Sequence, residues 1–252
     1  LVENGFDVAL FLKHLHSCVL IKLMSVGILP VHASCVSYNG ESILLAGFGG
    51  TGKTRLILQL INSGCHFVSD DWTLMHDGHS SAYKDGFLMC DYDMKEFPEF
   101  ARLNLIDRFR LAVNGLRKFR VLYKGLEYLG LPLQGRCYGV DQAFDMSASS
   151  VNIGKVFLVQ RSDVPQPQII RVELEKVVAQ ITEVCSRENA LFRYQYGLFR
   201  LAFYGNDSRW FEDIMASYSR NIQLSLAELS VYVLNLPLQI KISEFDVKDL
   251  LH

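Results

Sequence analysis

Residues 47–54 read Gly47-Phe48-Gly49-Gly50-Thr51-Gly52-Lys53-Thr54, and they satisfy in full the pattern G-x-x-x-x-G-K-[ST] of a P-loop. An apolar run over 42–46 precedes the loop and an amphipathic segment over 55–61 follows it, which is the strand-to-helix setting that the motif requires. Glycines let a backbone adopt positive φ angles and approach phosphates, and successive amides at a helix N-terminus attract anions. We therefore expect this loop to bind a nucleoside triphosphate.

Within the loop, Lys53 is expected to contact the β- and γ-phosphates and Thr54 to supply a hydroxyl ligand to Mg²⁺. ATP and Mg²⁺ are the expected cofactors. The alternative is a glycine-rich turn that matches the pattern by chance, which happens on the order of 1% of the time in a chain of this length. The residues predicted to bind the nucleotide are Gly47, Gly49, Gly50, Thr51, Gly52, Lys53, Thr54 and Arg55.

Two carboxylates, Asp70 and Asp71, follow the predicted strand 66–69 and begin 17 residues beyond Lys53. An adjacent strand thus delivers a pair of acidic groups to the phosphate site. Such a pair suits phosphoryl transfer, because one carboxylate can accept the proton of an acceptor hydroxyl while the other supports Mg²⁺. The alternative is an ordinary turn at the end of a strand.

Three segments, Val31-His32-Ala33-Ser34, Ile43-Leu44-Leu45-Ala46-Gly47 and Gly64-Cys65-His66-Phe67-Val68-Ser69-Asp70-Asp71, together with the loop itself, resemble the catalytic core of HPr kinase/phosphorylase and its related kinases. That family is similar in fold to phosphoenolpyruvate carboxykinase. The resemblance is specific over roughly residues 27–76. It implies an ATP-dependent, Mg²⁺-requiring kinase that transfers the γ-phosphate to a hydroxyl, with serine of a protein or peptide as the first acceptor.

The resemblance also implies residue roles. Asp70 matches the general base of the family, Asp71 its neighbour and, with Thr54, the metal side of the site. Lys53 matches the phosphate-binding lysine, and His32 matches a histidine near the aspartate pair. Lys53, Asp70 and His32 are accordingly the expected catalytic residues.

The chain departs from the family in two places. Nothing in it corresponds to the family's N-terminal domain, and 105–110 is only a faint echo of the second family signature. HPr itself is therefore not implied as the substrate, and a small-molecule alcohol is a further acceptor class. The competing hypotheses are a nucleotide-binding regulatory or interaction protein without kinase activity, and a simple ATPase.

Composition restricts the partners. Among 252 residues, Lys and Arg number 25 and Asp and Glu 27, so the formal charge of −2 argues against a broad nucleic-acid surface. The most apolar stretch, 18–36, is interrupted by Lys22, Pro30 and His32, so we expect no membrane span and no signal peptide. The six cysteines form no C-x-x-C pair, which is typical of a reduced, cytoplasmic protein.

The sequence predicts a single α/β domain over 1–252, a P-loop-containing mixed sheet flanked by helices, with a core at 27–160 and a helical C-terminal part at 170–252. A hairpin is expected around Asn39-Gly40, between apolar runs at 31–36 and 42–46. The other expected elements are helices at 6–26, 55–61, within 99–121, from Leu174 and over 187–221, strands at 66–69, 156–159, 231–234 and 238–241, a meander over 73–89, and a last helix opened by Ser243-x-x-Asp246.

Further cations are expected near a phosphoryl-transfer site, and the sequence leaves their source open. Arg161 and Arg193 are equal candidates. The basic segment 108–124 is either a solvated helical face or an acceptor surface. The aromatic segment 192–204 is interpreted as core or as an oligomer contact, and since hexamers occur in the related family, a homo-oligomer is one open alternative.

Overall fold

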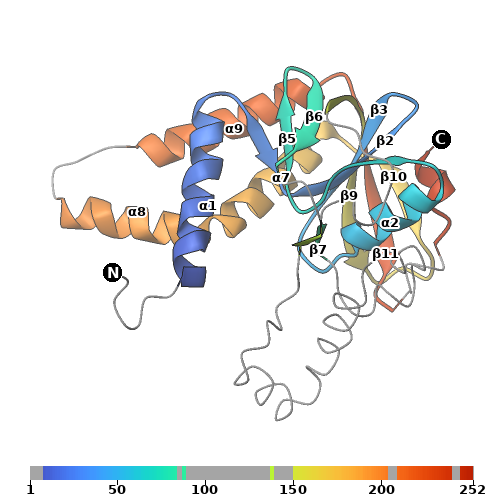
Figure 1. Cartoon of the computed structure of the whole chain (residues 1–252), viewed down its shortest axis with the longest axis horizontal. Helices are drawn as coiled ribbons and strands as arrows, with labels where there is room; N and C mark the ends of the chain where they lie inside the picture. Colours follow the sequence, from blue (N-terminus) through green and yellow to red (C-terminus); the bar gives the residue numbers. More distant parts are fainter. Residues whose placement is uncertain are drawn as a thin grey trace, which may run out of the picture.

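A computed structural model describes residues 8–83, 87–88, 137–138, 150–203, 209–239 and 245–251. It has a mixed α/β architecture in which one sheet carries helices on both faces (Figure 1). The helices are α1 Val8–Ser25, α2 Lys53–Asn62, α7 Leu174–Glu188, α8 Ala190–Ala202, α9 Trp210–Leu226 and the 3₁₀ helix η4 Val247–Leu250. The strands are β1 Leu29–Val31, β2 Ala33–Tyr38, β3 Glu41–Ala46, β4 His66–Ser69, β5 Thr73–His76, β6 His79–Ala82, β7 Phe87–Leu88, β8 Cys137–Tyr138, β9 Ser150–Ser162, β10 Gln168–Arg171 and β11 Ser230–Pro237.

The long strand β9 organises the sheet. On one side it pairs in parallel with β3, which continues to β2 and β4. On the other side its first residues pair with β6, and its remaining length pairs in parallel with β11, whose far edge carries β10. Strands β5 and β1 extend the β6 branch. Because β2 runs antiparallel to both β3 and β4, strands β3, β4, β9 and β11 share one direction.

Side chains alternate between two apolar layers along each central strand. Ile43 and Leu45 of β3 pack in the cluster that contains α2 and η4, whereas Leu44 and Ala46 pack in the cluster that contains α1, α7 and α9. This alternation is the period of two that a strand imposes. A sheet covered on both faces explains why residues 43–46 of β3 and the middle of β9 are apolar without interruption.

The predicted hairpin and the two helices around it are confirmed. Asn39 and Gly40 adopt φ of 51° and 85°, as a two-residue hairpin turn with two positive φ angles requires, and Tyr38 pairs with Glu41. Helix α1 fills the predicted 6–26 region from Val8 onward. Helix α2 ends before Gly64, where the amide of Cys65 donates to the carbonyl of Leu60 at 3.0 Å.

The C-terminal half differs from prediction in three places. Strand β10 lies between β9 and the helix from Leu174, where no strand was predicted. Leu238 and Gln239 form a turn rather than the start of a strand, and 240–241 lie outside the described residues. The last helix begins at Val247 with Asp246 itself as cap, because the Asp246 carboxylate accepts from the amide of Lys248 at 3.0 Å.

The other predicted elements have the following outcomes. The strands at 66–69 and 231–234 are confirmed, and the strand at 156–159 is the centre of the longer β9. The helix from Leu174 is α7, and the helical region 187–221 comprises the end of α7, α8 and most of α9. In the predicted meander, a turn at Asp77-Gly78 joins β5 to β6, but 84–86 and the helices within 99–121 fall outside the described residues. Across the described chain, no helix is both long and apolar enough to cross a bilayer.

Candidate functional site

The carboxyl ends of three of the four parallel strands bring the predicted site residues together. Strand β3 ends in the P-loop, β4 ends in Asp70-Asp71, and β9 continues to Arg161. Strand β4 pairs with β2 and not with β3, so β2 separates the two strands that carry the predicted site. The carboxyl edge of parallel strands is where open α/β sheets bind ligands, since the loops that follow such strands meet there.

Backbone geometry in the P-loop depends on glycine at its first position. Gly47 has φ of 145°, and a Cβ placed on it would lie 2.5 Å from the carbonyl oxygen of Val159 on β9. Gly50 and Gly52 also have positive φ, 80° and 104°. Helix α2 begins directly after Gly52 without a side-chain cap, which leaves its first amides directed toward the loop. Loop and helix N-terminus together have the backbone geometry that the predicted anion site requires.

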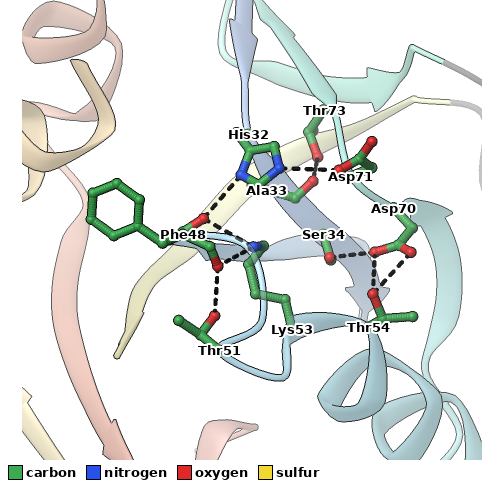
Figure 2. Close-up of polar contacts among 11 residues, drawn as sticks. His32, Ala33, Ser34, Phe48, Thr51, Lys53, Thr54, Asp70, Asp71 and Thr73 are labelled. Atoms are coloured by element: carbon green, nitrogen blue, oxygen red, sulfur yellow. Dashed lines mark hydrogen bonds and ion pairs between the residues drawn. The ribbon is translucent and has the colours of Figure 1, made fainter. Parts of the chain in front are cut away.

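Lys53 lies inside this loop. Its side chain is buried, and the ammonium group donates to the carbonyl oxygens of Gly47 and Phe48, both at 2.9 Å (Figure 2). Burial lowers the pKa of Lys53, and the negative charges of Asp70, Asp71 and Glu188 offset part of that effect. The ammonium group is thus held within the loop by carbonyl oxygens. There it can form a charge-assisted hydrogen bond to a phosphate that enters the loop.

Asp70 lies opposite the first turn of α2. The Thr54 hydroxyl donates to its carboxylate, 3.1 Å from each oxygen, and the Ser34 hydroxyl donates to the same group (Figure 2). Asp70 is buried, and burial raises the pKa of its carboxyl, while the hydrogen bonds from Ser34 and Thr54 act in the opposite direction. Thr54 and Asp70 therefore face the same point beside the P-loop.

Asp71 points away from Thr54 and toward His32. Its side chain is 62% exposed, and one carboxylate oxygen lies 3.0 Å from Nε2 of His32, while Nδ1 of His32 lies 3.0 Å from the carbonyl oxygen of Gly47. His32 stands at the break between β1 and β2, with its ring edge-on to Trp72. The ring thus connects the first residue of the P-loop to the second aspartate (Figure 2).

Asp71 also has an unusual backbone. Its φ is 69°, a left-handed conformation that a residue with a Cβ adopts at some cost. The amide of Trp72 donates to the carbonyl of Asp70 across this turn, at 2.8 Å. The two neighbouring aspartates consequently point in different directions, one toward Thr54 and one toward His32.

Two contacts at the site were not predicted from the sequence. Ser34 holds Asp70, a pairing that follows from the register of β2 against β4 and its bulge at Cys35 and Val36. Arg161 donates from Nε to the carbonyl of Thr51 at 3.1 Å and from Nη1 to the carbonyl of Pro237 at 2.8 Å. The signal in the sequence that could have indicated the Ser34 contact is a serine within a mostly apolar strand segment.

The two arginines that the sequence left equal are separated by the fold. Arg161 contacts the P-loop backbone, and the charge of Arg55 lowers the pKa of Arg161 in addition to the effect of burial, so both cations lie at the loop. Arg193 instead lines a cavity between α7, α8 and α9. The basic segment 108–124 falls outside the described residues.

The oxygen donors fit a magnesium ion bound together with a nucleotide. Mg²⁺ in such sites takes one or two carboxylates, a hydroxyl and phosphate oxygens. Thr54 and Asp70 supply a hydroxyl and a carboxylate that already face each other at 3.1 Å. Within the described residues, no three His, Cys, Asp or Glu side chains gather as a metal cage, which a site completed by phosphates does not need.

Comparison with known proteins adds no family to this geometry. No family model matches the chain, and no curated protein matches it.

Proposed function

We propose that this chain is an ATP-dependent phosphotransferase that transfers the γ-phosphate to a hydroxyl, with serine of a protein or peptide as the first acceptor class. The observation that carries the proposal is the convergence of Lys53, Thr54 and Asp70 beside an uncapped helix N-terminus. Phosphoryl transfer depends mainly on positioning and charge neutralisation, and these residues supply both. The same features support placement in the P-loop kinase group related to HPr kinase and phosphoenolpyruvate carboxykinase.

For the two aspartates, the geometry favours an exchange of the roles that the family resemblance implies. Asp70 accepts from the Thr54 hydroxyl, and this pairing suits the metal side of the site. Asp71 is exposed and hydrogen bonded to His32, which suits a group that meets an acceptor arriving from solvent. We therefore assign magnesium support to Thr54 and Asp70, and proton acceptance to Asp71.

In the proposed reaction, each residue has a defined task. The amides at 49–54 and the Lys53 ammonium bind the triphosphate, and Mg²⁺, which Thr54 and Asp70 would hold, would supply charge neutralisation there. The acceptor hydroxyl loses its proton to Asp71 while its oxygen bonds to the γ-phosphorus, and the bond from that phosphorus to the β,γ-bridging oxygen breaks to release ADP. His32 acts as a positioning residue, because it holds the Asp71 carboxylate and the Gly47 carbonyl.

The test compares three variants with the wild type, using ATP binding in Mg²⁺ and transfer of labelled γ-phosphate to components of a cell extract. Lys53→Ala is expected to lose nucleotide binding. Asp70→Asn is expected to weaken Mg²⁺-dependent binding at least tenfold, whereas Asp71→Asn keeps nucleotide affinity within about twofold and loses about 10²–10⁴ in transfer rate.

Other results would contradict either the assigned aspartate roles or the proposed function. If Asp70→Asn binds Mg·ATP normally and loses transfer while Asp71→Asn transfers normally, Asp70 is the base that the family resemblance implies. ATP retained by the wild type without transfer to any acceptor and without phosphate release would favour the regulatory hypothesis. Phosphate release without an acceptor would favour a simple ATPase.

A further inference from the structure

A cavity of ≈ 510 Å³ opens beside Asp71 on the side away from Thr54. Helix α1 forms one wall with Leu12, Leu15 and Val19, whose side chains are exposed. Asp71 and Trp72 form the end nearest the P-loop, and Glu188 at the end of α7 completes the lining. Because the proposed proton acceptor is one of its walls, this cavity is where an acceptor hydroxyl would arrive.

Aromatic rings connect the cavity to the reacting groups. The His16 ring lies 5.8 Å from that of Trp72 and 5.3 Å from that of Tyr83, and Trp72 lies 5.4 Å from His32, which holds Asp71. Trp72 is buried, so its ring is fixed in place by the core beneath it. Ring faces and edges of this kind provide both apolar contact and a weak attraction for cations.

The charges around the cavity are unequal. Two carboxylates, Asp71 and Glu188, line it, against the single ammonium group of Lys13. Glu188 lies close enough to the phosphate site that its charge raises the pKa of Lys53 against the larger lowering by burial. The inner end of the cavity is therefore negative, which repels an anionic acceptor and favours a cationic one.

Exposure of the apolar wall indicates an extended ligand. A small-molecule pocket buries most of its ligand, whereas Leu12, Leu15 and Val19 are 55%, 48% and 39% exposed. An open groove with an apolar strip can hold a few residues of a peptide whose chain continues into solvent.

From these observations we propose that this cavity binds the acceptor as a peptide segment, with its serine or threonine hydroxyl at Asp71 and a neighbouring lysine or arginine between Glu188 and the aromatic rings. The inference rests on the proposed function and adds to it a substrate class, a basic hydroxyl-containing peptide. Glu188 selects the basic residue of the peptide, and Asp71 receives the proton of its hydroxyl.

The test measures peptide binding separately from transfer. Three fluorescently labelled peptides share a Leu-Ala core, with Ala in place of the reacting serine, and differ only in one flanking residue: Lys, Gln or Glu. Their anisotropy is measured with the full chain in the presence of Mg²⁺ and a non-hydrolysable ATP analogue. We expect the Lys peptide to bind about tenfold more tightly than the Glu peptide.

Two variants with opposite expected effects keep the test independent of folding defects. Glu188→Gln should reduce the ratio of Lys-peptide to Glu-peptide affinity at least threefold, and Lys13→Gln should increase it. Glu175→Gln is the matched control, because Glu175 is an exposed residue at the other end of α7 and does not line the cavity. It should leave the ratio unchanged.

The outcomes distinguish this inference from the function on which it rests. Equal affinity for the three peptides, a ratio insensitive to Glu188→Gln, or tighter binding of a small amino alcohol than of the Lys peptide would overturn the peptide site. If the wild type binds no Mg·ATP in the parallel titration, the proposed function fails, whereas a charge-selective peptide site that responds to Glu188→Gln would stand.

Discussion

Burial and hydrogen bonding act in opposite directions on the carboxyl group of Asp70. Burial raises its pKa above the ordinary value of 3.8, and the bonds from Ser34 and Thr54 do not cancel the effect. The folded chain therefore binds the Asp70 proton more tightly than the unfolded chain does. As the pH rises from about 4 to neutrality, Asp70 must ionise in a buried place, so its contribution to the free energy of unfolding falls with pH.

The first prediction follows from that sign. Asp70→Asn, without ligands, should raise the free energy of unfolding by about 1–2 kcal/mol at pH 7 and by much less near pH 3.5, where the wild-type carboxyl is protonated. Urea denaturation at the two pH values measures the difference. The matched control is Asp77→Asn, since the Asp77 side chain is 84% exposed. A wild type that is more stable than Asp70→Asn at pH 7 would contradict the role of burial.

Two glycines of the P-loop give a second prediction. Gly47→Ala places a Cβ against the carbonyl oxygen of Val159 and keeps a φ of 145°, whereas Gly49→Ala meets no atom within 4 Å. We expect Gly47→Ala to lower the free energy of unfolding by about 1–3 kcal/mol and to weaken nucleotide binding, because loop and β9 must separate. Gly49→Ala should remain within about 0.5 kcal/mol of the wild type. Equal effects in the two variants would show that the close approach is not required.

At the scale of elements, the parts with local signals were predictable. The Asn39-Gly40 turn and the P-loop each carry their geometry in a few adjacent residues. Strand β10 lacks such a signal, because Gln168–Arg171 is a four-residue segment next to prolines that becomes a strand by pairing with β11.

The site contacts of Ser34 and Arg161 were missed for the same reason, since pairing between distant strands determines them. The P-loop pattern and the position of Asp70-Asp71 after a strand predicted the phosphate loop and both aspartates, and the fold divided the aspartates between Thr54 and His32.

Arg161 on β9 connects the P-loop to the end of β11. Its guanidinium group joins the Thr51 carbonyl in the loop to the Pro237 carbonyl at the end of β11. Arg161→Gln should weaken Mg·ATP binding about 5- to 20-fold, because about 1–2 kcal/mol of charge-assisted hydrogen bonding no longer holds the loop. Calorimetric titration measures the affinity. Arg171→Gln, at an exposed position on β10, is the control, and an equal loss there would assign the effect to net charge alone.

At the scale of the whole molecule, the proposed nucleotide site and the proposed peptide groove involve elements that are far apart in sequence but share one sheet. Helix α2, with the P-loop, covers one face, and α1, α7 and α9, with the groove, cover the other. Tyr194 and Phe199 of α8 and Phe203 directly after it are exposed, so the core interpretation of the aromatic segment is wrong for these three residues. An oligomer contact remains the open alternative for that helix.

Removing a single hydrogen bond tests whether the two layers on either face of the sheet unfold as one unit. The Tyr218 hydroxyl on α9 donates to the Pro30 carbonyl on β1 at 2.8 Å, and both residues are buried. Tyr218→Phe leaves that carbonyl without its partner and should lower the free energy of unfolding by about 1–3 kcal/mol. Since β1 and the strands that α2 covers belong to one sheet, hydrogen exchange of amides in α2, on the opposite face, should accelerate as much as exchange in α9. The control is Tyr194→Phe, because the side chain of Tyr194 is 62% exposed.

A second measurement adds nucleotide to Tyr218→Phe. Mg·ATP at a hundredfold excess over its Kd should raise the free energy of opening by about 2.7 kcal/mol in both helices. Acceleration confined to α9, or restoration confined to α2, would mean that the two layers are separate cooperative units, and nucleotide binding on one face would then do nothing to order the groove on the other.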